Sequence, residues 1–133
     1  MAKKLVSHKR AQTRGEEVAN SVSHGVGFLA ALAASPVLIF SAVQHGSSAG
    51  IVGASVFAFT MVLLYITSSI YHTLARNKAK QVFQVLDHGA IFLMIAGTYT
   101  PFTLGVLRGA WGWTLFVIAG TACHFIAVLK YAV

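Results

Sequence analysis

Four long apolar segments constrain the fold of this chain more than any other feature of its sequence. They lie near residues 21–43, 49–74, 85–107 and 111–131. Each is long enough to cross a bilayer, because a membrane-spanning helix needs about 20 mostly apolar residues. Only 10% of the 133 residues are charged, against about a quarter in soluble domains. The sequence therefore predicts an all-α, polytopic membrane helix bundle.

The segments divide the chain into a basic tail, residues 1–20, and one membrane domain, residues 21–133. The tail could form the start of a signal peptide, with Ala31-Leu32-Ala33 as its cleavage site. Against cleavage, the apolar run continues to Val43, and Glu16 and Glu17 stand just before it. We therefore expect the first segment to be a retained membrane helix.

The basic residues indicate an orientation rather than a nucleic-acid partner. The net charge is +7, but the positive residues gather at the ends of the apolar segments and form no continuous stripe. The linker between the second and third segments carries Arg76, Lys78 and Lys80, whereas residues 44–48 carry no basic residue except His45. By the positive-inside rule, the N-terminus and this second linker lie in the cytoplasm. We expect a multi-pass protein of the plasma (inner) membrane, with membrane lipids as partners.

In this orientation, polar residues of three segments reach one depth of the membrane. Ionisable residues within a span usually face the bundle interior and are functional candidates. Ser68 and His72 share a helix face, as do Asn20 and His24, because each pair is four residues apart. The complete set comprises Glu17, Asn20, His24, Ser68, His72, Asp87 and His88.

These side chains are compatible with a metal site or with simple helix packing. Zinc binds imidazole nitrogen and carboxylate oxygen, and lowers the pKa of a bound water to about 7. His72 would be the ligand, Asp87 would bind the metal or hold the water, and Ser68 would support a substrate oxygen. Alternatively, such residues only hydrogen-bond across helices or cap them. Cys123 is the only cysteine, which excludes an intrachain disulfide and a cysteine-based zinc motif.

Other residues indicate architecture. Pro101 and Pro36 each remove a backbone donor and are expected to kink their helices. Small residues allow helices to approach closely. The candidates for such contacts are Gly50, Gly53, Gly89, Gly97 and Gly120.

Several motifs resemble the hemolysin III proteins of the progestin and adipoQ receptor group, within the alkaline ceramidase-like superfamily. They are Glu17-x2-Asn20-x3-His24, Ser68-x3-His72, Asp87-His88-Gly89-Ala90-Ile91 and Ala96-Gly97-Thr98-Tyr99-Thr100-Pro101-Phe102. The resemblance implies a seven-helix fold, of which four transmembrane helices are present here. It also implies that His72 is a direct zinc ligand and that Asp87 holds a zinc-bound water. Two further histidine ligands come from the seventh helix of zinc-bearing relatives.

The resemblance leaves three functions open. The first is zinc-dependent hydrolysis of lipid amides or esters, with Asp87 and Ser68 as catalytic residues. The second is a membrane-perturbing, channel-like or membrane-homeostasis role, as the hemolysin label of bacterial relatives implies. The third is a structural role in which any metal only stabilises the protein. Two expected histidines are missing, so we expect a fragment of a longer protein, a homo-oligomer or a non-catalytic remnant, with His24 or His124 as possible substitute ligands.

Overall fold

The chain folds into a row of long helices. The computed structural model describes residues 12–75, 77–107 and 109–132, with side chains as far as residue 126. No strand occurs within these ranges, so the predicted all-α class is confirmed. The elements are α1 (Arg14–His45), α2 (Ser48–Thr73), α3 (Lys78–Thr100), a π-helical stretch (Pro101–Leu107) and α4 (Gly109–Ala132).

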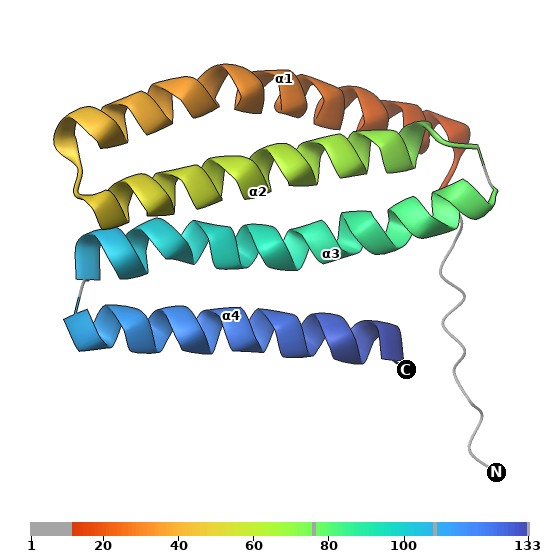
Figure 1. Ribbon diagram of the computed structural model, residues 1–133. Helices are drawn as coiled ribbons and strands as arrows, with labels where there is room; N and C mark the ends of the chain where they lie inside the picture. The colour runs from red at the N-terminus through yellow and green to blue at the C-terminus, as the bar shows by residue number, and fades with distance from the viewer. Residues whose placement is uncertain (1–11, 76, 108, 133) are drawn as a thin grey trace, which may run out of the picture.

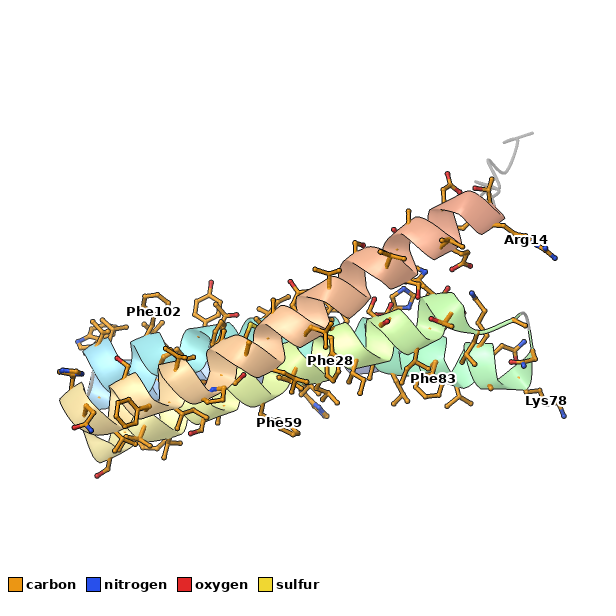
Figure 2. All side chains as sticks on the ribbon, turned by 90° about the horizontal axis from the view of Figure 1, so that it is seen from above. Arg14, Phe28, Phe59, Lys78, Phe83 and Phe102 are labelled. Carbon is orange, nitrogen blue, oxygen red and sulfur yellow. The ribbon has the colours of Figure 1, made fainter. Side chains whose placement is uncertain are left out.

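The helices lie side by side in chain order (Figure 1). Within the described part of the chain, α1 packs on α2, α2 on α3 and the π stretch, and α4 on α3 and the π stretch. Seen from above, α1 crosses α2 and α3 obliquely (Figure 2). The start of α1, the end of α2 and the start of α3 therefore meet at one end of the molecule, which we call the α1-start end (Figure 1).

The interior of this row is built from small residues, while large apolar side chains face outward. Ala54, Ala58 and Ala90 are buried, whereas Phe59 and Trp111 are 67% and 76% exposed. In lipid, small residues let helix backbones approach, and large apolar residues need no protein cover. All four helices are long and apolar enough to cross a membrane, with mean hydropathies of 1.3 to 2.2. The fold is therefore that of a membrane helix bundle.

Two helices begin earlier than the predicted spans. Helix α1 begins at Arg14 rather than near residue 21, because Thr13 and Glu16 form a capping box. Helix α3 begins at Lys78 rather than near residue 85, because the Asn77 side chain accepts a hydrogen bond from the Lys80 backbone N–H at 3.0 Å. Such caps satisfy backbone donors that a helix leaves open at its start. The predicted linker is consequently shorter, and Lys80 belongs to the first turn of α3.

Pro101 ends the regular α-helical pattern, as a residue without a backbone donor should. The chain continues as a π stretch of seven residues before α4. By contrast, α1 remains helical through Pro36. The Ser35 side chain in the preceding position donates a hydrogen bond to the carbonyl oxygen of Ala31 at 2.6 Å.

Candidate functional site

Charged and imidazole side chains of three helices meet at the α1-start end. Glu17 lies in the first turn of α1, His72 in the last turn of α2 and Lys80 in the first turn of α3. Their side chains are 19%, 9% and 13% exposed. We call these three residues the Glu17 cluster. The local caps explain the meeting, because they extend α1 and α3 to the level at which α2 ends.

Glu17 is the centre of this cluster. Its Oε2 lies 2.7 Å from Nδ1 of His72, and its Oε1 lies 2.7 Å from Nζ of Lys80. Lys80 also donates to the carbonyl oxygen of Leu74 at 3.2 Å. An ionised carboxylate only accepts hydrogen bonds, so Nδ1 of His72 is the donor. The other ring nitrogen, Nε2, then carries the lone pair of the neutral ring.

The imidazole ring of His72 also contacts other rings in the bundle. The His72 ring centroid lies 5.8 Å from that of His24 and 4.7 Å from that of Tyr71. His24 also meets Tyr65 at 5.9 Å. Nδ1 of His24 is buried and has no hydrogen-bond partner in the described structure. Buried polar atoms nearly always have a partner, so this nitrogen is a candidate to bind a further group.

The other predicted residues lie in the same three helices, near this end. Ser68 and Asp87 are buried, with 1% and 7% of their surface exposed. His88 meets Tyr71 at a centroid distance of 6.5 Å. Asn20 accepts a hydrogen bond from Ser23 through its backbone carbonyl at 3.0 Å. Among the described residues, no three His, Cys, Asp or Glu side chains converge as a metal site.

His124 is placed differently from His24. It is exposed on α4, whereas His24 faces His72. Helix α4 packs on α3 and the π stretch, and no contact with α1 or α2 occurs in the part of the chain that the structure covers. Of the two substitute ligands considered from the sequence, only His24 therefore lies beside His72.

A groove of about 710 Å³ borders the Glu17 cluster. Arg14, Glu17, His72 and Lys80 contribute to its wall, together with Thr73 at the end of α2. The groove lies between the start of α1 and the end of α2, so the Glu17 cluster borders an open space. It is large enough for part of a small molecule or a lipid headgroup.

Sequence reasoning missed Lys80 and Tyr71 as members of the site. Lys80 counted only as a linker charge, although Asn77, a favoured capping residue three positions earlier, predicts a helix start that would turn it inward. Its Nζ also lies 4.8 Å from the centroid of the Tyr71 ring. For Tyr71 itself, the sequence offers no signal beyond its position next to His72.

These features define the class of the protein: a helical membrane protein with an ionisable cluster where three of its helices meet. The chain belongs to the family described as Haemolysin-III related, which matches residues 12–132. The predicted resemblance to hemolysin III proteins is thereby confirmed.

Two curated relatives support the family. The chain is 44% identical over 106 residues to Hemolysin-3 of Bacillus cereus, covering 80% of this chain and 48% of the relative. It is 45% identical over 103 residues to the Hemolysin-3 homolog of Bacillus subtilis (strain 168), covering 77% and 48%. The chain thus spans about half the length of these relatives. No solved structure matches it.

Proposed function

We propose that this chain supplies part of an intramembrane zinc site for the hydrolysis of lipid amides or esters. The observation that supports the proposal best is the pair of imidazoles at the α1-start end. His24 and His72 face each other at 5.8 Å, and His24 has a buried Nδ1 without a partner. Such a nitrogen is a natural ligand for a metal ion.

The donor set fits zinc in kind. Zinc takes imidazole nitrogen and carboxylate oxygen, and a catalytic site uses three protein ligands. Nε2 of His72 is free to bind the metal ion because Nδ1 is engaged with Glu17. The family resemblance implies that two further histidines lie in a seventh helix of relatives. In the proposal, His72 binds zinc through Nε2, His24 beside it is a second ligand through its open Nδ1, and further ligation comes from outside the described residues.

The proposed chemistry is attack of water on a carbonyl group. When bound, zinc would act as a Lewis acid: it would polarise the carbonyl and make hydroxide available near neutral pH. Asp87, buried in α3, accepts the proton of the attacking water at a carboxylate oxygen and returns it to the amine or alcohol that leaves as the C–N or C–O bond breaks. Ser68, buried in α2, donates a hydrogen bond to the substrate carbonyl oxygen. A lipid substrate suits a site at the end of helices whose outer surfaces are apolar.

Metal content tests this proposal directly. The protein is purified in detergent and its zinc measured by elemental analysis, with His72→Ala and the control His45→Ala. His45 lies at the last turn of α1, at the opposite end of the molecule. We expect about one zinc per chain or per oligomer, as for a single protein zinc site. It should be lost in His72→Ala and kept in His45→Ala. A folded wild-type protein without zinc refutes the proposal for this chain.

Activity is the second test. Turnover of a lipid amide such as ceramide is expected in a zinc-loaded sample, and loss of turnover is expected in His72→Ala and Asp87→Ala. If His72→Ala lowers only thermal stability and no activity exists to lose, the metal has a structural role instead.

The names of the two relatives favour a second candidate function. Both are called hemolysins, a word for proteins that lyse red cells. We propose membrane permeabilisation as the alternative. It predicts dye release from liposomes that continues when a chelator removes metal. No release at any dose of folded protein argues against it.

A further inference from the structure

We propose that Glu17 is a positioning residue for His72, and that Lys80 fixes Glu17 in turn. This inference rests on the proposed zinc site and concerns how His72 is prepared as its ligand. It assigns specific roles to Glu17, which the sequence suggested only as part of a polar cluster, and to Lys80, which counted only as a linker charge. The three residues come from three different helices, so the tertiary fold itself orients the ligand.

Glu17 engages one of the two ring nitrogens of His72. Its Oε2 accepts a hydrogen bond from Nδ1 of His72 at 2.7 Å. This contact selects the tautomer with hydrogen on Nδ1 and leaves Nε2 with a lone pair. Metal-ligating histidines generally donate their second ring N–H to a carboxylate or carbonyl, which fixes the ring and raises its basicity. The Glu17–His72 contact has this form.

Lys80, in turn, holds the carboxylate of Glu17 in place. A glutamate side chain has several rotatable bonds, so one contact would not hold its carboxylate in place. Lys80 donates to the other oxygen, Oε1, at 2.7 Å and to the carbonyl of Leu74 at 3.2 Å. Leu74 is the C-cap residue of α2. Lys80 therefore ties the carboxylate to the end of the helix that carries His72.

The Glu17–His72 contact is not the only bond that joins α1 to α2. A second set of bonds already joins α1 to α2: the Ser21 and Thr73 hydroxyls meet at 2.6 Å, and Ser69 donates to the Ser21 carbonyl at 3.3 Å. Joining α1 to α2 thus does not require Glu17. A contact that only fastened the helix ends would leave the zinc affinity of His72 unchanged, so this affinity separates the two interpretations.

The first experiment measures zinc affinity of the full chain by competition with a chelating dye. Glu17→Gln is compared with Glu16→Gln, which removes the same charge from the same turn. Glutamine is also accepted in the capping box of Glu16 and Thr13. We expect Glu17→Gln to weaken zinc binding by about 10- to 100-fold, as for other partners of metal-ligating histidines. Equal affinities for the two variants overturn the inference.

The second experiment needs no metal. Nitrogen-15 NMR of the imidazole rings reports which nitrogen of His72 carries hydrogen, and His72→Gln identifies the signal. In metal-free wild type we expect hydrogen on Nδ1, and in Glu17→Ala a shift toward the Nε2–H tautomer. Hydrogen on Nε2 in the wild type, or no change in Glu17→Ala, overturns the inference even if zinc binds.

Lys80→Gln tests whether the contact of Lys80 with Glu17 holds the carboxylate in place, and Lys78→Gln is the control. Lys78 is exposed in the same turn of α3. We expect Lys80→Gln to weaken zinc binding in the same direction as Glu17→Gln but less, and Lys78→Gln to leave it unchanged. Equal affinities of the two lysine variants refute the role of Lys80.

The outcomes separate this inference from the proposed function. If His72→Ala retains zinc, the zinc proposal fails, and the tautomer measurement still decides whether Glu17 orients His72. If His72→Ala loses zinc while Glu17→Gln and Glu17→Ala bind as wild type does, only the positioning role fails.

Discussion

Gly53 lies directly against the π stretch, where a side chain has no room. A Cβ atom built on Gly53 would stand 2.7 Å from Cα of Pro101 and 3.1 Å from its nitrogen. These are backbone atoms, so they cannot rotate away as the tip of a side chain can. We predict that Gly53→Ala forces α2 and the π stretch apart and destabilises the protein by about 1–3 kcal/mol, as overpacking usually does.

Gly50→Ala is the matched control for this prediction, and thermal unfolding in detergent is the measurement. The nearest neighbour of a Cβ atom built on Gly50 would be Oγ of Ser47 at 3.7 Å, an ordinary contact. Alanine also favours a helix by about 1 kcal/mol over glycine. Gly50→Ala should therefore unfold at or above the wild-type temperature. A Gly53→Ala protein as stable as Gly50→Ala would contradict the packing argument.

At this scale, the sequence identified which residue types matter but not which of them make contacts. All five glycines considered from the sequence were candidates for helix contacts, yet nothing lies within 4 Å of a Cβ built on Gly89 or Gly120. Likewise, the four-residue spacing within each of two pairs, Asn20 with His24 and Ser68 with His72, predicted two polar faces. The structure brings the two imidazole rings together. Local periodicity gives the face of a helix, whereas the partner depends on how helices cross.

The start of α3 depends on one capping residue. Asn77 accepts a hydrogen bond from the backbone N–H of Lys80, and replacement of such a cap by alanine costs about 0.5–2 kcal/mol. We predict that Asn77→Ala frays the first turn of α3, lowers the unfolding temperature and loosens the contact of Lys80 with Glu17. Asn77→Asp, which keeps the acceptor, should behave as wild type.

Hydrogen exchange measures this effect locally. Amides in the first turn of α3 should exchange faster in Asn77→Ala, whereas those in the middle of α3 should not. Uniformly faster exchange along α3, or none at all, would show that the cap does not hold this turn.

The helix boundaries show why the sequence prediction was incomplete. The apolar runs located all four helices, because lipid-facing segments must be apolar throughout. They did not predict the polar first turns of α1 and α3, which caps rather than hydropathy determine. Since the first turn of α3 carries Lys80, the same omission hid Lys80 as the third member of the Glu17 cluster, whereas Glu17 and His72 were predicted.

On the scale of the whole molecule, the order of the helices explains the location of the candidate site. Each helix packs on its chain neighbour, so successive helix ends alternate between the two ends of the row (Figure 1). The end that gathers Glu17, His72 and Lys80 is therefore also the end that carries Arg14 and Lys78. The orientation of this end in the membrane remains a prediction from charge.

We predict that the α1-start end faces the cytoplasm. The sequence between α2 and α3 and the first turn of α3 carry Arg76, Lys78 and Lys80, whereas of the two linkers at the opposite end one has no lysine or arginine and the other has Arg108 alone. Single cysteines at Lys78 and Gln44, in a Cys123→Ala background, test this with a membrane-impermeant maleimide. Both positions are exposed. Lys78→Cys should react only in inside-out vesicles, and Gln44→Cys only in right-side-out vesicles. The reverse pattern would place the Glu17 cluster and its groove on the outer surface, where a lipid substrate would have to come from the outer leaflet.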